Sequence, residues 1–577
     1  MRRTAGLAAS LAGLAAALAA AFVIAPLGPT TIDPDASASV LYFERLVAGR
    51  RLEAFVPTTP KPLLTVVDGL AWQLTSDWRV LTWIALACFG LAVALAALFV
   101  WRAWAGADRG RAAVPRASAR VGTAAEVGAP GEVGAEVEVG VAAAVGAAAG
   151  AVFIAVALAS WSDLALEVSR ANSLVPSLAC WAAAGVALSG PRRRPGIAGI
   201  ALLLGGLARF ETIGIVVAIL GVAALLRVAE AIAGRRLLGD GPRCARRDVV
   251  LIVGLGLLAI PVACLHDWLL TGDPLYWTAV PARYTAIYAP GLAPTPLVAY
   301  LGTLAGRLAG QWPLVALAGV GALALAARRA YVPLVGLGSL AVGMIVLLCG
   351  LAVRGIYISN RYDEPLDLAL LGLAGFAVAA LVELAAGRLL DLARPDRLLA
   401  PLGRLGAMAG LAATLVVTVA AAGGIMGSPA AWDPTVAATL APIRSASVDL
   451  DANLARLAAL VPATPLASTA SRPAGAPPAD PHAIELFVPS TLRSRLAVAA
   501  GLPLTVVGDT FAAYMARPSW AGLHPGQWLY HDPAVDRPTA LTRALDADSP
   551  DLGGLAARTL WFDATSGVRL LRVVAAR

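Results

Sequence analysis

The sequence has almost no lysine and little charge of either sign. Lys61 is the only lysine in 577 residues, and charged residues make up 14% of the chain. Soluble domains carry nearer a quarter, which argues against a soluble protein over most of the length. A genome that prefers arginine codons explains the missing lysines, and the one that survives hints at a position that needs a compact ammonium group.

Cysteine and histidine are also scarce, and neither shows the spacing of a metal site. The five cysteines lie among apolar runs and are interpreted as buried thiols: Cys88, Cys180, Cys244, Cys264 and Cys349. Near the C-terminus, no metal-ligand spacing is matched by His482, His524, His531 and Asp532. These residues therefore do not indicate a metal centre.

Long apolar runs are what the sequence has in abundance. They recur from Gly6 to Met426, and lengths near twenty residues are what a bilayer core requires. After Met426 no long apolar run follows, and short apolar stretches are typical of strands. The sequence predicts a polytopic α-helical membrane domain over residues 1–428 and a small extracytoplasmic α/β domain over 429–577.

About eleven spans are expected from these runs. Nine are Leu7–Leu27, Val80–Val100, Val139–Ala159, Leu174–Leu188, Val249–Cys264, Trp312–Ala326, Val332–Ala352, Leu368–Ala386 and Leu405–Met426. The first could instead be a cleaved signal peptide. The run Ile197–Leu226 would be about 45 Å long as one helix, too long for a core of roughly 30 Å. It is therefore expected to turn back at Arg209-Phe210-Glu211, as a helical hairpin of two spans.

Arginine placement predicts the orientation. Under this topology the cytoplasmic loops hold about twenty-two basic against about eleven acidic residues, and the outer loops about eleven against about fourteen. The N-terminus is then cytoplasmic and the C-terminal domain lies outside the plasma membrane. Because the arginines sit in short loops between spans, the net charge of +8 does not indicate nucleic-acid binding.

The outer segments hold the candidate site residues. Asp33 and Asp35 follow the first run, an amphipathic helix is expected next, and a proline-braced turn at Pro57–Pro62 carries Lys61. Further along, the outer segments contribute Asp163, Glu167, Arg209, Glu211, Arg283 and Arg361. Charge near a bilayer is costly and usually functional. A carboxylate can take a proton from a hydroxyl, and cations can hold a phosphate leaving group.

The order of these motifs resembles the GT-C superfamily of polytopic glycosyltransferases, over about Leu7 to Met426. The segment IDPDASASVLYFERLVAGRRLEAFVP resembles its first outer loop, and Asp35-Ala36 matches the Asp-Ala of bacterial arabinofuranosyl- and mannosyltransferase-like members. LARFET, TGDPLYW and NRYDEP resemble later loops of the family. In this chain Pro34 separates two acids that are adjacent in many relatives.

The resemblance implies an inverting sugar transfer from a polyprenyl-phosphate donor to a glycan, protein or lipid acceptor. Asp35, or second Asp33, would be the general base. Donor-phosphate binding would fall to Lys61, Arg209, Arg283 and Arg361, and acceptor binding to Asp163, Glu167 and Glu211. A divalent metal is left open.

Other interpretations stay open at this point. Asp35 suits a helix N-cap, Arg209 and Glu211 suit a simple pair at a hairpin tip, and tryptophans near span ends, such as Trp78 and Trp277, are typical interface anchors. Asp33-Pro-Asp35 also spells a metal-binding Asp-x-Asp, but no nucleotide-binding domain precedes it. A transporter or lipid flippase is the alternative function, although the charges gather at helix ends rather than at the bilayer midplane.

Overall fold

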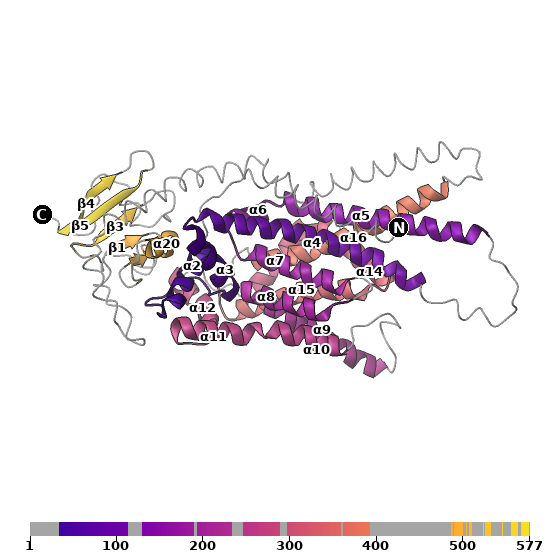
Figure 1. The fold of residues 1–577 in the computed structure, drawn as a ribbon, viewed down its shortest axis with the longest axis horizontal. Helices are drawn as coiled ribbons and strands as arrows, with labels where there is room; N and C mark the ends of the chain where they lie inside the picture. The colour runs from indigo at the N-terminus through magenta and orange to yellow at the C-terminus, as the bar shows by residue number, and fades with distance from the viewer. Residues whose placement is uncertain are drawn as a thin grey trace.

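The computed structural model describes residues 34–112, 130–189, 193–233, 246–288, 297–358 and 362–392 of the helical part, and 486–488, 490–499, 504, 507–509, 523, 525–531, 545, 555–562 and 567–575 beyond it. The helices are α2 Pro34–Val47, α3 Pro62–Thr75, α4 Arg79–Ala112, α5 Pro130–Ser160, α6 Ser162–Ser169, α7 Leu174–Leu188, α8 Pro195–Ala208, α9 Glu211–Ala233, α10 Arg246–Leu257, α11 Ala259–Thr271, α12 Tyr276–Tyr288, α13 Leu297–Gly310, α14 Trp312–Ala327, α15 Tyr331–Val353 and α16 Glu364–Leu392. They form one elongated bundle, with α2, α3 and α12 at the end nearest the C-terminal strands (Figure 1).

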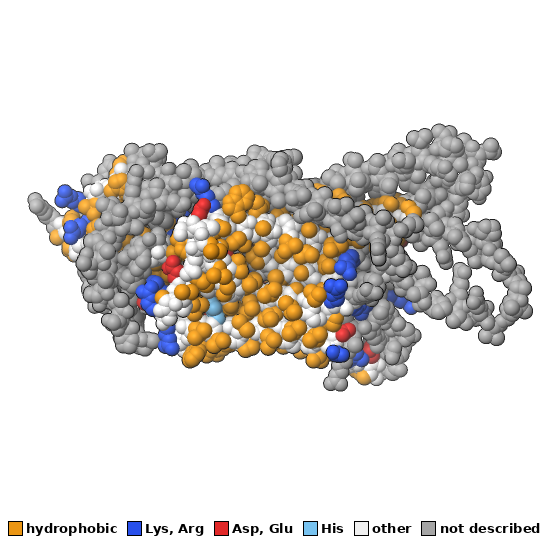
Figure 2. All heavy atoms as spheres, viewed as in Figure 1, with side chains coloured by type: hydrophobic (Ala, Val, Ile, Leu, Met, Phe, Trp, Pro, Cys, Tyr) orange, Lys and Arg blue, Asp and Glu red, His pale blue; other side chains and the backbone are white. Residues whose placement is uncertain are grey.

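Several of these helices are long and apolar enough to cross a bilayer. Among the described residues, six qualify by length and composition, or seven if the bent pair α13 and α14 counts as one span. Figure 2 shows the corresponding surface, a broad apolar face with charged side chains gathered toward its two ends. In water such a face would cost free energy, whereas in contact with lipid it does not. The chain is therefore a multi-pass membrane protein.

The predicted span count stays a prediction. Leu7–Leu27 and Leu405–Met426 lie outside the described residues. α7 and α8 are apolar but have only 15 and 14 residues, short of the length that an upright span requires. α14 matches the predicted span Trp312–Ala326 within one residue, and α13, which was not predicted as a span, meets it at an angle of 84°.

The expected break at Arg209-Phe210-Glu211 is present. α8 ends at Ala208 and α9 begins at Glu211, with Arg209 in an extended conformation between them. Glu211 in the first turn of α9 is favourable, because a carboxylate there interacts with the positive end of the helix dipole.

The segment from His266 to Tyr288, which contains the TGDPLYW motif, is largely helical. α11 continues to Thr271, where Gly272 ends it in the left-handed conformation, and α12 follows from Tyr276. The fully buried Asp267 accepts a hydrogen bond from the backbone amide of Trp277 at 2.6 Å. A carboxylate from the neighbouring helix therefore caps the start of α12, a tertiary contact that local sequence does not reveal.

Beyond the bundle, the described residues form a five-stranded sheet of order β2-β1-β3-β5-β4. Its strands are β1 Leu486–Val488, β2 Val507–Asp509, β3 Trp528–His531, β4 Leu555–Phe562 and β5 Arg569–Ala575. β1 pairs in parallel with β2 and β3, whereas β5 runs antiparallel to β3 and β4. Together with helix α20, Ser490–Ala499, these strands are called the C-terminal unit below.

Backbones in the bundle approach closely where glycine permits it. A Cβ added at Gly321 of α14 would collide with the backbone carbonyl of Leu373 on α16, whereas one at Gly319 would meet nothing within 4 Å. The α14–α16 interface therefore depends on the absent side chain at Gly321.

Gly321→Ala is expected to destabilise the detergent-solubilised protein by about 1–3 kcal/mol, because the helices must separate to admit the methyl group. The thermal midpoint of unfolding should fall, while Gly319→Ala on the same helix leaves it unchanged. Equal midpoints for the two variants would contradict the close packing of α14 on α16.

Candidate functional site

Asp35 lies in the first turn of α2, the helix that was predicted to follow the two acids. The helix begins at Pro34, whose fixed φ suits a first helical position, and Asp35 occupies the first turn. The expected helix is confirmed, and its residues Val40, Leu41 and Tyr42 are buried within the protein.

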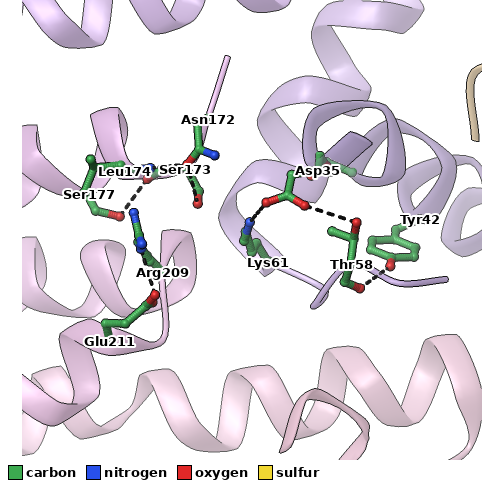
Figure 3. A network of polar contacts seen from close by, with 11 residues as sticks. Asp35, Tyr42, Thr58, Lys61, Asn172, Ser173, Leu174, Ser177, Arg209 and Glu211 are labelled. Carbon is green, nitrogen blue, oxygen red and sulfur yellow. Dashed lines mark hydrogen bonds and ion pairs between the residues drawn. The ribbon is translucent and has the colours of Figure 1, made fainter. Parts of the chain in front are cut away.

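Asp35 is held by two partners from the proline-braced turn. The Lys61 ammonium lies 2.7 Å from one carboxylate oxygen of Asp35, and the Thr58 hydroxyl donates to the other at 3.1 Å (Figure 3). Lys61 occupies the N-cap position of α3 in an extended conformation, with Pro62 directly after it. The turn thus brings the single lysine of the chain onto the carboxylate predicted to be the base.

Two further contacts brace this arrangement. The Tyr42 hydroxyl donates to the carbonyl oxygen of Thr58 at 2.6 Å, which fixes the turn against α2. Arg45, one helical turn further along, pairs with Glu53 at 3.2 Å although it is only 2% exposed. Burial is the main reason why the pKa of Tyr42 is raised well above its usual value, so its hydroxyl keeps its proton and remains a donor.

A second carboxyl group lies beside Lys61. Asp68 is buried on α3, which is not among the candidate spans. Burial raises the pKa of this carboxyl from 3.8 to about 8, and the charge of Lys61 opposes the shift. Lys61 therefore interacts with one carboxylate in direct contact and with a second carboxyl group that is protonated at neutral pH.

Arg209 and Glu211 form a pair across the break between α8 and α9. The Arg209 Nε donates to Glu211 at 2.9 Å, and both side chains are largely buried. Next to them the rings of Phe210 and Trp277 stack with centroids 4.6 Å apart. The simple pairing that suits a hairpin tip is present, and it places a guanidinium at the break between the two helices.

Residues between α6 and α7 face this region from a third element. The Asn172 side chain accepts from the backbone amide of Leu174 at 3.0 Å and so caps α7. In Figure 3, Asn172 and Ser173 lie near Arg209, and Asp35 with Lys61 lies opposite them. Side chains from α2, from the turn before α3 and from the α8–α9 break thus meet at one end of the bundle.

The other predicted site residues are placed as follows. Asp33 and Arg361 lie outside the described residues, as does the side chain of Asp163, which belongs to α6. Glu167 is buried on α6. Arg283 is exposed on α12, close enough to Tyr276 to oppose the rise in its pKa, which burial brings to about 12.

Sequence reasoning missed Thr58, Tyr42 and Asp68. Tyr42 belongs to the predicted amphipathic helix and Thr58 to the predicted turn, so both lay in segments already marked as functional. Nothing local identified Asp68, because a single acid in an apolar helix has no spacing signal. Among the described residues, no group of three or more His, Cys, Asp or Glu side chains is placed to hold a metal ion.

The Asp68 carboxyl predicts how stability depends on pH. The folded protein keeps this proton up to about pH 8, whereas the group has a pKa of 3.8 without the fold. The unfolded chain binds fewer protons between these values, so the free energy of unfolding falls as pH rises through this window. Asp68→Asn should flatten the fall in thermal midpoint between pH 5 and pH 8. The exposed Asp77→Asn should keep the wild-type slope, and an equally steep slope for Asp68→Asn would contradict the assignment.

No protein family matches the chain, and no curated protein does. Among solved structures the chain is similar to ArnT from Cupriavidus metallidurans bound to undecaprenyl phosphate, with 15% identity, a TM-score of 0.44 and 97% of each chain covered. It is also similar to the apo form of an oligosaccharyltransferase from Archaeoglobus fulgidus, with 13% identity, a TM-score of 0.44, and 90% of this chain and 69% of that chain covered. At this similarity neither substrates nor site residues carry over to the chain.

Proposed function

We propose that the protein is a membrane glycosyltransferase that moves a sugar from a polyprenyl-phosphate donor to an acceptor hydroxyl outside the cytoplasm. The single observation that carries the proposal is the contact of Asp35 with Lys61, which faces the side of the site that holds the Arg209 guanidinium (Figure 3). A base and two cations at the level of lipid phosphates are the groups that such a transfer requires.

The ion pair suggests how donor binding prepares the base. A phosphate near Arg209 competes with Asp35 for the Lys61 ammonium, because two cations hold an anion better than one. Once Lys61 turns to the phosphate, Asp35 loses its counter-charge and becomes a stronger acceptor of protons. Thr58 then keeps the carboxylate oriented through the hydrogen bond to its other oxygen.

The proposed reaction is a displacement of the lipid phosphate at the anomeric carbon of the donor sugar. Asp35 takes the proton of the acceptor hydroxyl while the acceptor oxygen forms a bond to the anomeric carbon. The bond from that carbon to the phosphate oxygen breaks, and its electron pair stays on the polyprenyl phosphate. Lys61 and Arg209 stabilise the negative charge that develops there. Attack from the face opposite the phosphate inverts the anomeric configuration.

An apolar cavity lies where the lipid chain of such a donor would enter. Its volume is about 150 Å³ and it is enclosed by α4, α5, α7, α8, α9, α15 and α16. Ile215, one turn beyond Glu211, and Leu340 line it, and almost all of its wall is hydrocarbon. A phosphate at Arg209 would leave its first isoprenoid units beside this cavity.

Asp35→Asn should lower the transfer rate by at least about 10²-fold, because the acceptor hydroxyl then loses its general base. The assay uses the protein in proteoliposomes with polyprenyl-phosphate arabinofuranose and mannose as the first donors and a cell-envelope extract as acceptor. Asp77→Asn, on the exposed turn before α4, is the matched control and should retain activity. Transfer by a folded Asp35→Asn protein at the wild-type rate would exclude Asp35 as the base, and lipid movement without transfer would favour the flippase alternative.

Ile215→Trp should raise the KM for the lipid-linked donor with little effect on kcat, because the indole fills space needed by the chain. Leu220→Trp is the control, since Leu220 is 45% exposed on the same helix. Measuring transfer against donor concentration separates the two constants. An unchanged KM in a folded Ile215→Trp protein would show that the donor chain lies elsewhere.

A further inference from the structure

Helix α20 of the C-terminal unit lies against the helix that carries Asp35. Nearly all of its described side chains are buried or half-buried, and Ala497, Val498 and Leu504 share one apolar cluster with Val40 and Val56 of the first outer loop. α20 is therefore buried between the strands of its own unit and the α2 segment of the bundle.

Arg493 of α20 joins the two parts through hydrogen bonds to backbone. One terminal nitrogen donates to the carbonyl oxygen of Phe55 and the other to that of Leu504, each at 2.9 Å. The planar guanidinium makes the two contacts through two separate nitrogens held in a fixed fork, whereas a lysine has all its donors on one nitrogen. Phe55 lies three residues before Thr58, so Arg493 holds the same turn that carries the partners of Asp35.

Arg495 contacts the chain after the C-terminal end of α3, at Trp78. Its guanidinium lies 5.2 Å from the ring centre of Trp78, which in turn stacks on Trp72 at 4.2 Å. Trp78 is only 6% exposed, so it is an internal contact rather than the lipid-interface anchor expected from sequence. Arg493 and Arg495 thus contact the chain before and after α3, the helix whose N-cap is Lys61.

Apart from the contacts of Thr58 and Lys61 with Asp35, two further contacts hold the turn between Phe55 and Lys61. Tyr42 holds the carbonyl of Thr58, and the ring of Phe55 packs edge-on to Tyr276 with centroids 6.5 Å apart. The segment has no helix or strand between Arg50 and Lys61. A loop of this kind opens at a small cost in free energy unless side chains from other elements hold it.

From these contacts we propose that Arg493 is a positioning residue: the C-terminal unit sets the geometry of Asp35, Thr58 and Lys61 through the Arg493 contact to Phe55. The proposal rests on the proposed transferase function for its effect on rate, although the contact itself does not. The unit therefore acts on the reaction through the loop, whether or not it touches the acceptor. Loss of the contact shifts Thr58 and Lys61 relative to Asp35, and small displacements of reacting groups cost rate more than binding.

The test compares Arg493→Ala, Arg493→Lys and Arg558→Ala in the full chain in nanodiscs. Arg558 is exposed on β4 of the same unit and is the matched control. Hydrogen exchange measured by mass spectrometry reports the protection of residues 52–61, independently of any activity. Steady-state transfer reports kcat and the KM for donor. Arg493→Lys serves if Arg493→Ala does not fold, because it keeps the charge while losing the second hydrogen bond.

We expect faster exchange in 52–61 and a fall in kcat on the order of 10²-fold for Arg493→Ala. We expect an intermediate result for Arg493→Lys and wild-type values for Arg558→Ala. Unchanged exchange in 52–61 would overturn the proposal, as would faster exchange with an unchanged kcat. If the wild type transfers no sugar, the proposed function fails, and the exchange experiment still decides whether Arg493 holds the loop.

Discussion

The end of the bundle nearest the C-terminal strands is organised around an ion pair that is largely shielded from water. Asp35 and Lys61 have side chains 22% and 11% exposed, and they meet at 2.7 Å. Leaving either charge alone at such a depth costs about 3–5 kcal/mol, so the start of α2 and the start of α3 are tied together. Thr58, Tyr42 and the contact from Arg493 then fix the turn between them.

The same ion pair is central to the chemistry proposed for the site. In the proposed reaction, the salt bridge with Lys61 keeps Asp35 from acting as a base until a phosphate binds Lys61. The charge of Arg209 is already balanced by Glu211, at the break between two apolar helices. In the proposed reaction, Arg209 binds the phosphate from this position. The adjoining bundle contributes apolar side chains and a cavity. The groups proposed to react lie at one end of the bundle.

Much of the bundle was predictable, because hydrophobic runs of span length and helix breaks at charged residues are local signals. The start of α2, the proline turn and the break at Arg209-Phe210 were all expected from such signals. α12 was not, since Asp267 caps it from another helix. The bend between α13 and α14 was not expected either. The apolar pattern indicates the length and polarity of a helix but not the angle at which it meets the next helix.

The sequence by itself determined that the chain is a multi-pass membrane protein and which segments carry the charges, since hydropathy and charge are properties of each segment alone. Only the tertiary structure decided which charges meet. Lys61 reaches Asp35 rather than solvent, Asp68 is protonated beside it, and Trp78 is buried under Arg495. Such pairings depend on how separate segments pack, because a side chain's partner and its access to water are set by neighbours far away in the chain.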